Sequence, residues 1–222
     1  MAIKRLPSYR SYNARVLFNY MAIQNHTKDI VDAVLANLGF NALSLDPVEC
    51  LSYFAKTCLG GKSVYHQSAK PENSPDLVNC ATFTQWVYAQ IGVALPLRAI
   101  QQYQMGEPIL DTFALKVGDL LFKVGLKNYW DYDDPGRKIG HVGIVMDVDS
   151  KDGAVGHATQ NSSGVVETTI NDFIKQNGLF VAGCRIVPNL KNWTVFNIPP
   201  ELRWRIKSSD DLKWLILESL PD

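Results

Sequence analysis

The sequence lacks the features that mark nucleic-acid-binding and metal-binding proteins. Its lysines and arginines number 22, its aspartates and glutamates also 22, and basic residues form no long run. Binding to phosphates needs a basic surface, so we expect no nucleic-acid partner. The four cysteines and four histidines form no CxxC pair and no metal-like cluster, so we expect neither a metal ion nor another cofactor.

Long apolar stretches are also missing. No stretch reaches the roughly 18 apolar residues that a transmembrane helix requires, so we expect no membrane span. Residues 1–8 carry charges without a following apolar run, and residues 9–20 are interrupted by Arg10, Asn13 and Arg15. We therefore recognise no signal peptide.

A disulfide framework is not expected either. Cys50 and Cys58 lie on one predicted helix, where their spacing corresponds to about 12 Å, too far for a disulfide. Reduced thiols are the simpler interpretation. A chain of 222 residues is long enough to bury an apolar core without cross-links.

The apolar pattern changes along the chain from helical spacing to strands. It predicts helices over 10–25 and 27–38, one starting at Asp46-Pro47, and one running from Asn79 to Gly92. Further helices are predicted over 98–105, 170–177 and 209–219, and strands over 120–122, 142–148, 154–158, 165–169 and 180–187. Helices followed by a meander of strands indicate an α+β fold rather than a parallel βαβ sheet.

Cys80 is the first candidate for chemistry. It follows Asn79, a good N-cap residue, and opens a helix with an apolar face. The positive end of the helix dipole and the free N–H groups of the first turn favour a thiolate, which is the reactive form of cysteine. From position alone, a buried structural cysteine is an equally good interpretation.

His141 and His157 are the next candidates. His141 begins one predicted strand and His157 lies in the next, with the turn-forming residues 149–153 between them. Antiparallel pairing across this turn places the two rings roughly opposite each other on one face of the sheet. An imidazole can accept a thiol proton near neutral pH, and a polar group bonded to that imidazole fixes its tautomer.

Several motifs occur in the order found in one known family. The segments NCATFTQWVY at 79–88 and GVALP at 92–96 resemble the nucleophile helix of NlpC/P60 hydrolases. The segments VGDLLF at 117–122, HVGIV at 141–145, GHA at 156–158 and GVV at 164–166 resemble its strands. The resemblance covers about residues 47–188.

The resemblance implies a papain-like α+β fold, with N-terminal helices and the nucleophile helix packed on a central antiparallel sheet. It divides the chain into an N-terminal helical extension (1–46), a catalytic domain (47–188) and a C-terminal extension packed on that domain (189–222). It also implies a Cys-His-His triad without a metal, in which Cys80 is the nucleophile, His141 the base and His157 the orienting group. Such enzymes cleave peptide bonds in peptidoglycan through a thioester, so the expected partner is a peptide or a peptidoglycan fragment.

Four further residues are candidates for oxyanion or substrate contacts. Tyr65, in an upstream loop, matches a family tyrosine that helps to stabilise the oxyanion together with the Cys80 N–H group. Asn79 and Ala81 stand where the family usually has Asp and Ser, which predicts altered substrate recognition with the chemistry retained. Trp130 lies in a long loop, 123–140, that leads into His141 and is either a substrate platform or a surface insertion.

Two alternative functions stay open at this point. The thioester of a papain-like acyltransferase is captured by an amine or alcohol instead of water, and a binding module keeps the fold without catalysis. The expected location is the cytoplasm, or outside the cell after export without a recognisable signal, as for a bacterial effector or phage-associated protein. The oligomeric state is not predicted.

Overall fold

The computed structural model describes residues 14–24, 26–124, 139–175 and 180–220. Their contacts divide the chain into two compact units. The larger unit comprises the described parts of Leu51–Val87 and Leu95–Pro188. The smaller unit comprises the described parts of Pro7–Cys50, Tyr88–Ala94 and Asn189–Asp222.

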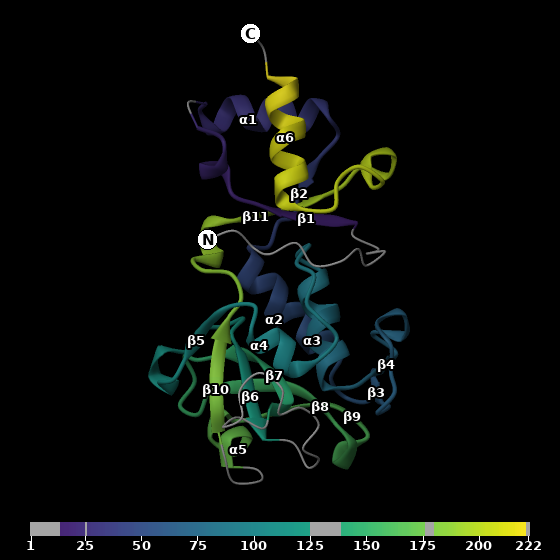
Figure 1. The fold of residues 1–222 in the computed structure, drawn as a ribbon, viewed down its shortest axis with the longest axis vertical. Coiled ribbons are helices and arrows are strands. Elements are labelled where there is room, and N and C mark those ends of the chain that lie inside the picture. Colours follow the sequence, from purple (N-terminus) through teal and green to yellow (C-terminus); the bar gives the residue numbers. More distant parts are fainter. Residues whose placement is uncertain (1–13, 25, 125–138, 176–179, 221–222) are drawn as a thin grey trace. The chain divides into compact units, whose positions relative to one another are not determined.

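A curled sheet forms the centre of the larger unit (Figure 1). Its described strands lie in the order β4 (Leu77–Val78), β3 (Val64–Tyr65), β9 (Gly164–Thr168), β8 (Ala154–Thr159), β7 (Ile139–Asp147), β6 (Leu120–Val124), β10 (Phe180–Arg185) and β5 (Glu107–Ile109). All neighbours pair antiparallel except β3 and β4, which are parallel. Strands β6 to β9 follow one another in sequence, which confirms the predicted meander and the α+β class.

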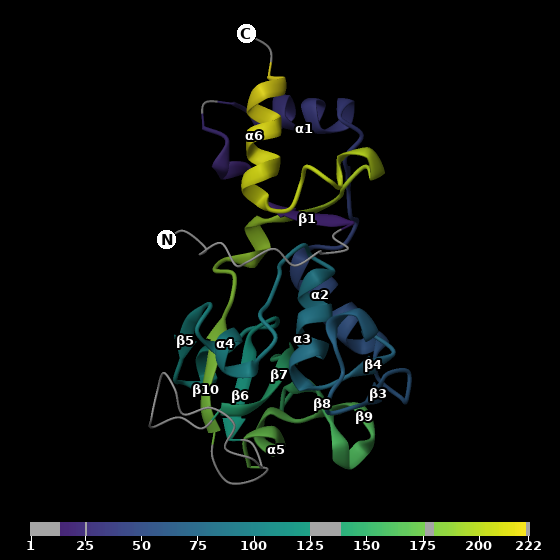
Figure 2. The same ribbon diagram turned by 45° about the vertical axis from the view of Figure 1, so that its right-hand side comes forward.

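Helices α2 (Pro47–Thr57), α3 (Cys80–Ala89) and α4 (Ala99–Tyr103) lie together on one side of the sheet strands in Figures 1 and 2, and α5 (Ile170–Lys175) lies at the opposite end. The predicted apolar face of α3 is buried, with Phe83 and Val87 fully covered. The Phe83 ring packs against β8 at Gly156, which has no side chain. A Cβ atom at this position would lie 3.6 Å from the Cζ atom of Phe83. This contact fixes α3 against β8.

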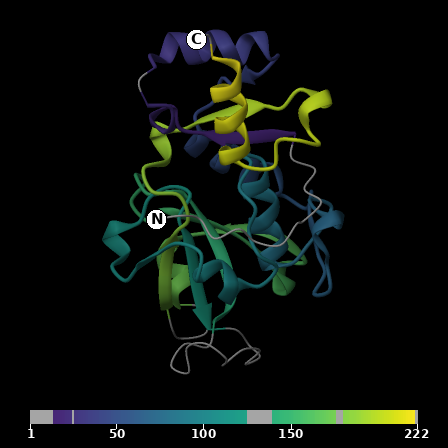
Figure 3. The ribbon, with the colours of Figure 1, turned by 45° about the horizontal axis from the view of Figure 1, so that its top comes forward.

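The smaller unit contains β1 (Arg15–Phe18), β11 (Thr194–Asn197) and β2 (Asn41–Ala42), which pair antiparallel in that order. Helices α1 (Lys28–Asn37) and α6 (Ser209–Ser219) pack on these strands through a shared apolar core (Figures 1 and 3). The helix predicted over 10–25 is wrong, because Arg15–Phe18 forms a strand. All four residues of β1 pair with β11, a partner nearly 180 residues away that helical periodicity cannot reveal.

Short 3-10 helices connect these elements. They are η1 (Tyr20–Ala22), η2 (Pro71–Asn73), η3 (Thr112–Ala114), η4 (Gln160–Ser162), η5 (Leu190–Asn192) and η6 (Pro200–Leu202). Among the described residues, no helix is long and apolar enough to cross a membrane. All four cysteines lie in the described residues and are free thiols, as expected.

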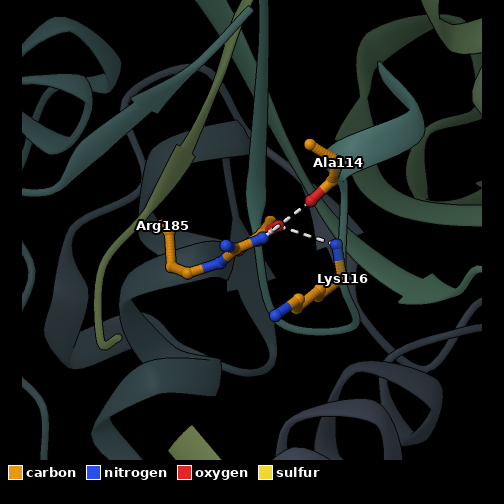
Figure 4. Close-up of polar contacts among 4 residues, drawn as sticks. Ala114, Lys116 and Arg185 are labelled. Atoms are coloured by element: carbon orange, nitrogen blue, oxygen red, sulfur yellow. Dashed lines mark hydrogen bonds and ion pairs between the residues drawn. The ribbon is translucent and has the colours of Figure 1, made fainter. Parts of the chain in front are cut away.

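The Gly-Asp motif before β6 has a structural role (Figure 4). Asp119 is only 3% exposed and accepts two hydrogen bonds from Arg185 of β10, at 3.0 Å and 2.7 Å. The backbone N–H of Lys116 donates to the same carboxylate, and Arg185 also donates to the carbonyl of Ala114. Bidentate hydrogen bonding between arginine and a carboxylate compensates for burying the charge, and it links β10 to the turn that precedes β6.

Candidate active site

Cys80 is the first residue of α3, and Asn79 caps the helix as predicted. The Asn79 Oδ1 atom accepts hydrogen bonds from the N–H groups of Ala81 and Thr82, each at 3.0 Å. The N–H of Asn79 in turn donates to the Thr82 hydroxyl at 2.9 Å. Together these bonds satisfy N–H groups of the first turn and fix the backbone on both sides of Cys80.

The other end of the Asn79 side chain holds a preceding loop. Its Nδ2 atom donates to the carbonyl oxygens of Gln67 and Ala69, at 3.3 Å and 3.1 Å. An aspartate at this position would keep the cap but would place negative charge against these two carbonyls. This geometry gives a physical reason for asparagine where the family pattern has aspartate.

Ala81 is buried, and its backbone is fully engaged. Its N–H donates to Asn79, while its carbonyl accepts from the Thr84 hydroxyl and from Nε2 of Gln102, each at 3.0 Å. Gln102 of α4 is itself completely buried, and its Oε1 atom accepts from Thr84 at 2.8 Å. Contacts of Asn79 or Ala81 with a substrate stay predictions.

His141 and His157 lie in contact, which confirms the predicted neighbourhood of the two rings. The Nε2 atom of His141 is 3.0 Å from Nδ1 of His157, and the rings are nearly perpendicular, at 88°. Strands β7 and β8 pair from Asp147↔Ala154 to Ile144↔Gly156, and both histidines lie past this paired end. A hydrogen bond from the N–H of Val142, the residue after His141 in β7, lowers the pKa of the Cys80 thiol, so the start of α3 lies beside this part of β7.

Phe173 of α5 covers both imidazole rings. Its ring is stacked on His141, with centroids 5.7 Å apart, and meets His157 edge-on at 5.1 Å. It reaches this position over Gly143, where a Cβ atom would lie 3.0 Å from the Phe173 Cε2 atom. The aromatic ring therefore excludes water from one side of the histidine pair.

Lys123 completes the immediate surroundings. It is paired with His141 across β6 and β7, so the two side chains leave the same face of the sheet. Lys123 is only 5% exposed, and its Nζ atom lies 4.5 Å from the centroid of the Phe173 ring. The buried Lys123 and His157 side chains thus lie close to the partly exposed His141 and Cys80.

Burial controls the protonation of the site. It raises the pKa of the Cys80 thiol, while the N–H groups of Val142, Ala81 and Cys80 and the charge of Lys123 act in the opposite direction. Burial also lowers the pKa of His141 well below 6.5, with further lowering by His157 and Lys123. The pKa of His157 falls to about 4, again through burial and then Lys123. At neutral pH the resting pair is therefore a thiol and a neutral imidazole.

The contact between the two rings determines which tautomer is able to act as a base. If Nε2–H of His141 donates to Nδ1 of His157, then Nδ1 of His141 carries a free lone pair. His157 then carries its own proton on Nε2, a buried atom without a hydrogen-bond partner among the described residues. In this arrangement His157 is the acceptor that orients His141.

Tyr65 and Trp130 differ in what the structure describes. Tyr65 is half-buried on β3, where it is paired with Val78, two residues before the nucleophile. Its role toward an oxyanion stays a prediction. Trp130 lies outside the described residues, and its role as a substrate platform also stays a prediction.

The sequence analysis missed Lys123, Phe173 and Gln102. The sequence predicts a strand that ends at residue 122 and a loop from 123 to 140, whereas Lys123 lies inside β6 (Leu120–Val124). Phe173 lies in a short helix without a motif. Gln102 lies in the short helix predicted after Pro96, but this position does not predict its hydrogen bonds to α3.

The sequence that forms this site matches a known protein family. A family model described as the NlpC/P60 family matches residues 63–182, which contain all three triad candidates. The chain belongs to the NlpC/P60 family. Among curated proteins, no relative matches the sequence.

Solved structures of NlpC/P60 proteins are similar in fold. NlpC2 from Trichomonas vaginalis matches with a TM-score of 0.50 and 20% identity, over 66% of this chain and 48% of that one. The peptidoglycan hydrolase RipB from Mycobacterium tuberculosis matches with a TM-score of 0.45 and 20% identity, over 72% and 80%. RipD from the same organism, a non-catalytic NlpC/P60 domain protein, matches with a TM-score of 0.47 and 14% identity, over 65% and 100%. The chain spans about half the length of the first structure.

The described residues bring together no three His, Cys, Asp or Glu side chains that could hold a metal ion.

Proposed function

We propose that this protein is a cysteine hydrolase that cleaves an amide bond through a thioester on Cys80. The observation that carries the proposal is the contact between Nε2 of His141 and Nδ1 of His157 at 3.0 Å. The next residue of β7, Val142, has a backbone N–H whose hydrogen bond lowers the pKa of the Cys80 thiol. Such a contact supplies a base with a fixed tautomer next to a nucleophile at a helix N-terminus. Family membership supports it, since NlpC/P60 proteins are typically peptidoglycan hydrolases.

The steps follow from the protonation of the resting site. Nδ1 of neutral His141 takes the proton of the Cys80 thiol, and the thiolate attacks the carbonyl carbon of the substrate amide. His141 then gives this proton to the leaving amine as the C–N bond breaks, leaving a thioester. Water, activated by the same imidazole, attacks the thioester and releases the acid and the free thiol. His157 stays neutral throughout and accepts the hydrogen bond from Nε2–H of His141.

The oxyanion formed in each attack needs hydrogen-bond donors. The backbone N–H of Cys80 is the proposed first donor, because the N–H groups of Ala81 and Thr82 are bound to Asn79. Tyr65 is the proposed second donor. The proposed substrate class is a peptide derived from peptidoglycan, with Asn79 and Ala81 altering which peptide is recognised.

The test is mass spectrometry of muropeptides after incubation with wild type and with Cys80→Ala. We expect wild type to produce fragments that differ by hydrolysis of one amide bond, and Cys80→Ala to produce none. Cys58→Ala, which removes another free thiol of the larger unit, is the matched control and should keep activity. Undiminished cleavage by Cys80→Ala would refute the mechanism. Binding of muropeptides without any cleavage by wild type would assign the protein to the binding modules instead.

A further inference from the structure

Lys123 is a charged residue in an unusual place. Its side chain is buried to 5% exposure in the middle of the sheet, on a strand flanked by β7 and β10. Lysine is almost never buried this deeply unless a specific interaction compensates for the loss of water. The groups around the Lys123 ammonium group must therefore compensate for its burial.

Geometry connects Lys123 to the two histidines through one ring. The Lys123 Nζ atom lies 4.5 Å from the centroid of Phe173, a distance typical of a cation–π contact. The same ring stacks on His141 and meets the edge of His157. Because Lys123 and His141 are cross-strand partners, their separation is fixed by the backbone and not by a flexible loop.

Within the described part of the chain, the charge of this ammonium group lowers the pKa of three titratable groups. They are Cys80 from α3, His141 from β7 and His157 from β8. The interactions are mutual, since burial lowers the pKa of Lys123 while a thiolate on Cys80 raises it. A positive charge here favours the thiolate and opposes protonation of both imidazoles.

We infer that Lys123 is a positioning residue of the active site, whose buried ammonium group stabilises negative charge on the Cys80 sulfur and keeps the resting His141 ring neutral. The inference deepens the proposed function and rests on it for its meaning in catalysis. The ammonium group loses and gains no proton in the reaction. The thiol proton moves to Nδ1 of His141, and the charge of Lys123 offsets the negative sulfur that remains.

The experiment follows alkylation of Cys80 by iodoacetamide as a function of pH, with modification of the Cys80 peptide measured by mass spectrometry. Only the thiolate reacts, so the midpoint of the rate profile reports the thiol's ionisation without any substrate. Lys123→Met removes the charge and keeps most of the apolar stem. Lys123→Arg keeps the charge, and Lys151→Met removes an exposed lysine from the turn between β7 and β8.

We expect the midpoint of Lys123→Met to lie about one pH unit above that of wild type, on the scale of one lost opposite charge. The midpoints of Lys123→Arg and Lys151→Met should match wild type. An unchanged or lowered midpoint in Lys123→Met would overturn the inference. So would an equal rise in Lys123→Arg, since that result would mean repacking and not charge.

Folding is checked by circular dichroism, and Lys123→Gln serves as a second neutral variant. The upward shift must appear in whichever neutral variant keeps the wild-type spectrum, and loss of the fold in both would assign Lys123 a structural role and contradict the inference. Failure of the proposed function is seen separately. If wild type cleaves no muropeptide, the alkylation midpoints still decide whether Lys123 controls the charge on Cys80.

Discussion

The Nδ1 atom of His157 lies 3.0 Å from Nε2 of His141, and His157 is almost fully buried while doing so. The proposed orienting group is therefore a neutral ring, not a carboxylate. In the proposed mechanism it stabilises the imidazolium form of His141 by a single hydrogen bond, without an ion pair. Three predictions start from this arrangement and from the cap beside Cys80.

The proposed mechanism requires a hydrogen-bond acceptor at position 157. The Oδ1 atom of asparagine can take the place of Nδ1, so His157→Asn should lower kcat/KM by less than about 10-fold, whereas His157→Leu should lower it by about 100-fold or more. Steady-state kinetics on a cleaved muropeptide measure both values. The control is His66→Asn, which removes an exposed imidazole. Equal activity of the Asn and Leu variants would show that no hydrogen bond to His141 is needed.

Acid should destabilise the fold through the two histidines. The pKa of His157 is lowered to about 4 and that of His141 well below 6.5, so an unfolded chain binds two protons between these limits that the folded chain does not. The free energy of unfolding therefore falls as the pH falls from about 6.5 to 4, by up to about 1.4 kcal/mol per pH unit for each histidine. It is fully recovered above pH 6.5.

Urea unfolding at a series of pH values between 7 and 4.5 measures this slope for the larger unit. His157→Asn removes one of the two groups and should reduce the slope by about half. His66→Gln is the matched control for loss of an imidazole. A slope unaffected by His157→Asn would contradict the assignment of buried neutral rings.

Asn79 should resist exchange for aspartate although aspartate is a good N-cap. Asn79→Asp keeps the bonds from Ala81 and Thr82 but loses both donors to the loop carbonyls of Gln67 and Ala69. We expect a net loss of about 1 kcal/mol in the free energy of unfolding, measured in urea at pH 7.

The control for this exchange is at the start of α2. Asp46 accepts a hydrogen bond from the N–H of Glu49 at 2.8 Å, so Asp46→Asn keeps the same acceptor. Its effect should stay within about 0.5 kcal/mol. A more stable Asn79→Asp variant would mean that the helix dipole outweighs the two lost hydrogen bonds.

Local sequence signals were sufficient for the histidine pair but not for its detailed register. The turn residues at 149–153 predict a hairpin that places His141 and His157 roughly opposite each other, and direct pairing of the two would centre it on residue 149. The hairpin instead closes at Asp147↔Ala154, and with the following irregularity in β7 the register moves by two residues. An even shift leaves both side chains on the same face, so the contact forms diagonally.

Long-range packing explains what the sequence could not predict. The local sequence predicts a helix where β1 forms, because the partner strand β11 lies near the other end of the chain. The sequence predicts a loop from residue 123, because a lysine after three apolar residues does not reveal that β6 continues with both faces buried; the face of Leu121 is covered by α5 through Phe173. The core that buries Lys123 contains residues from Ile109 to Phe173, so no short segment of sequence around Lys123 predicts it.

The residues of α3 are divided between the two compact units, since Cys80 to Val87 belong to the larger one and the last two residues of the helix to the smaller one. Directly after the helix, Gly92 lies so close to β1 that a Cβ atom would be 2.7 Å from Val16 Cα. A fragment trimmed to the family match at 63–182 would lose this neighbour and fray α3 from its C-terminal end. Amide hydrogen exchange along this one helix therefore records the opening of both units, and grafting the nucleophile into another protein would require carrying part of each.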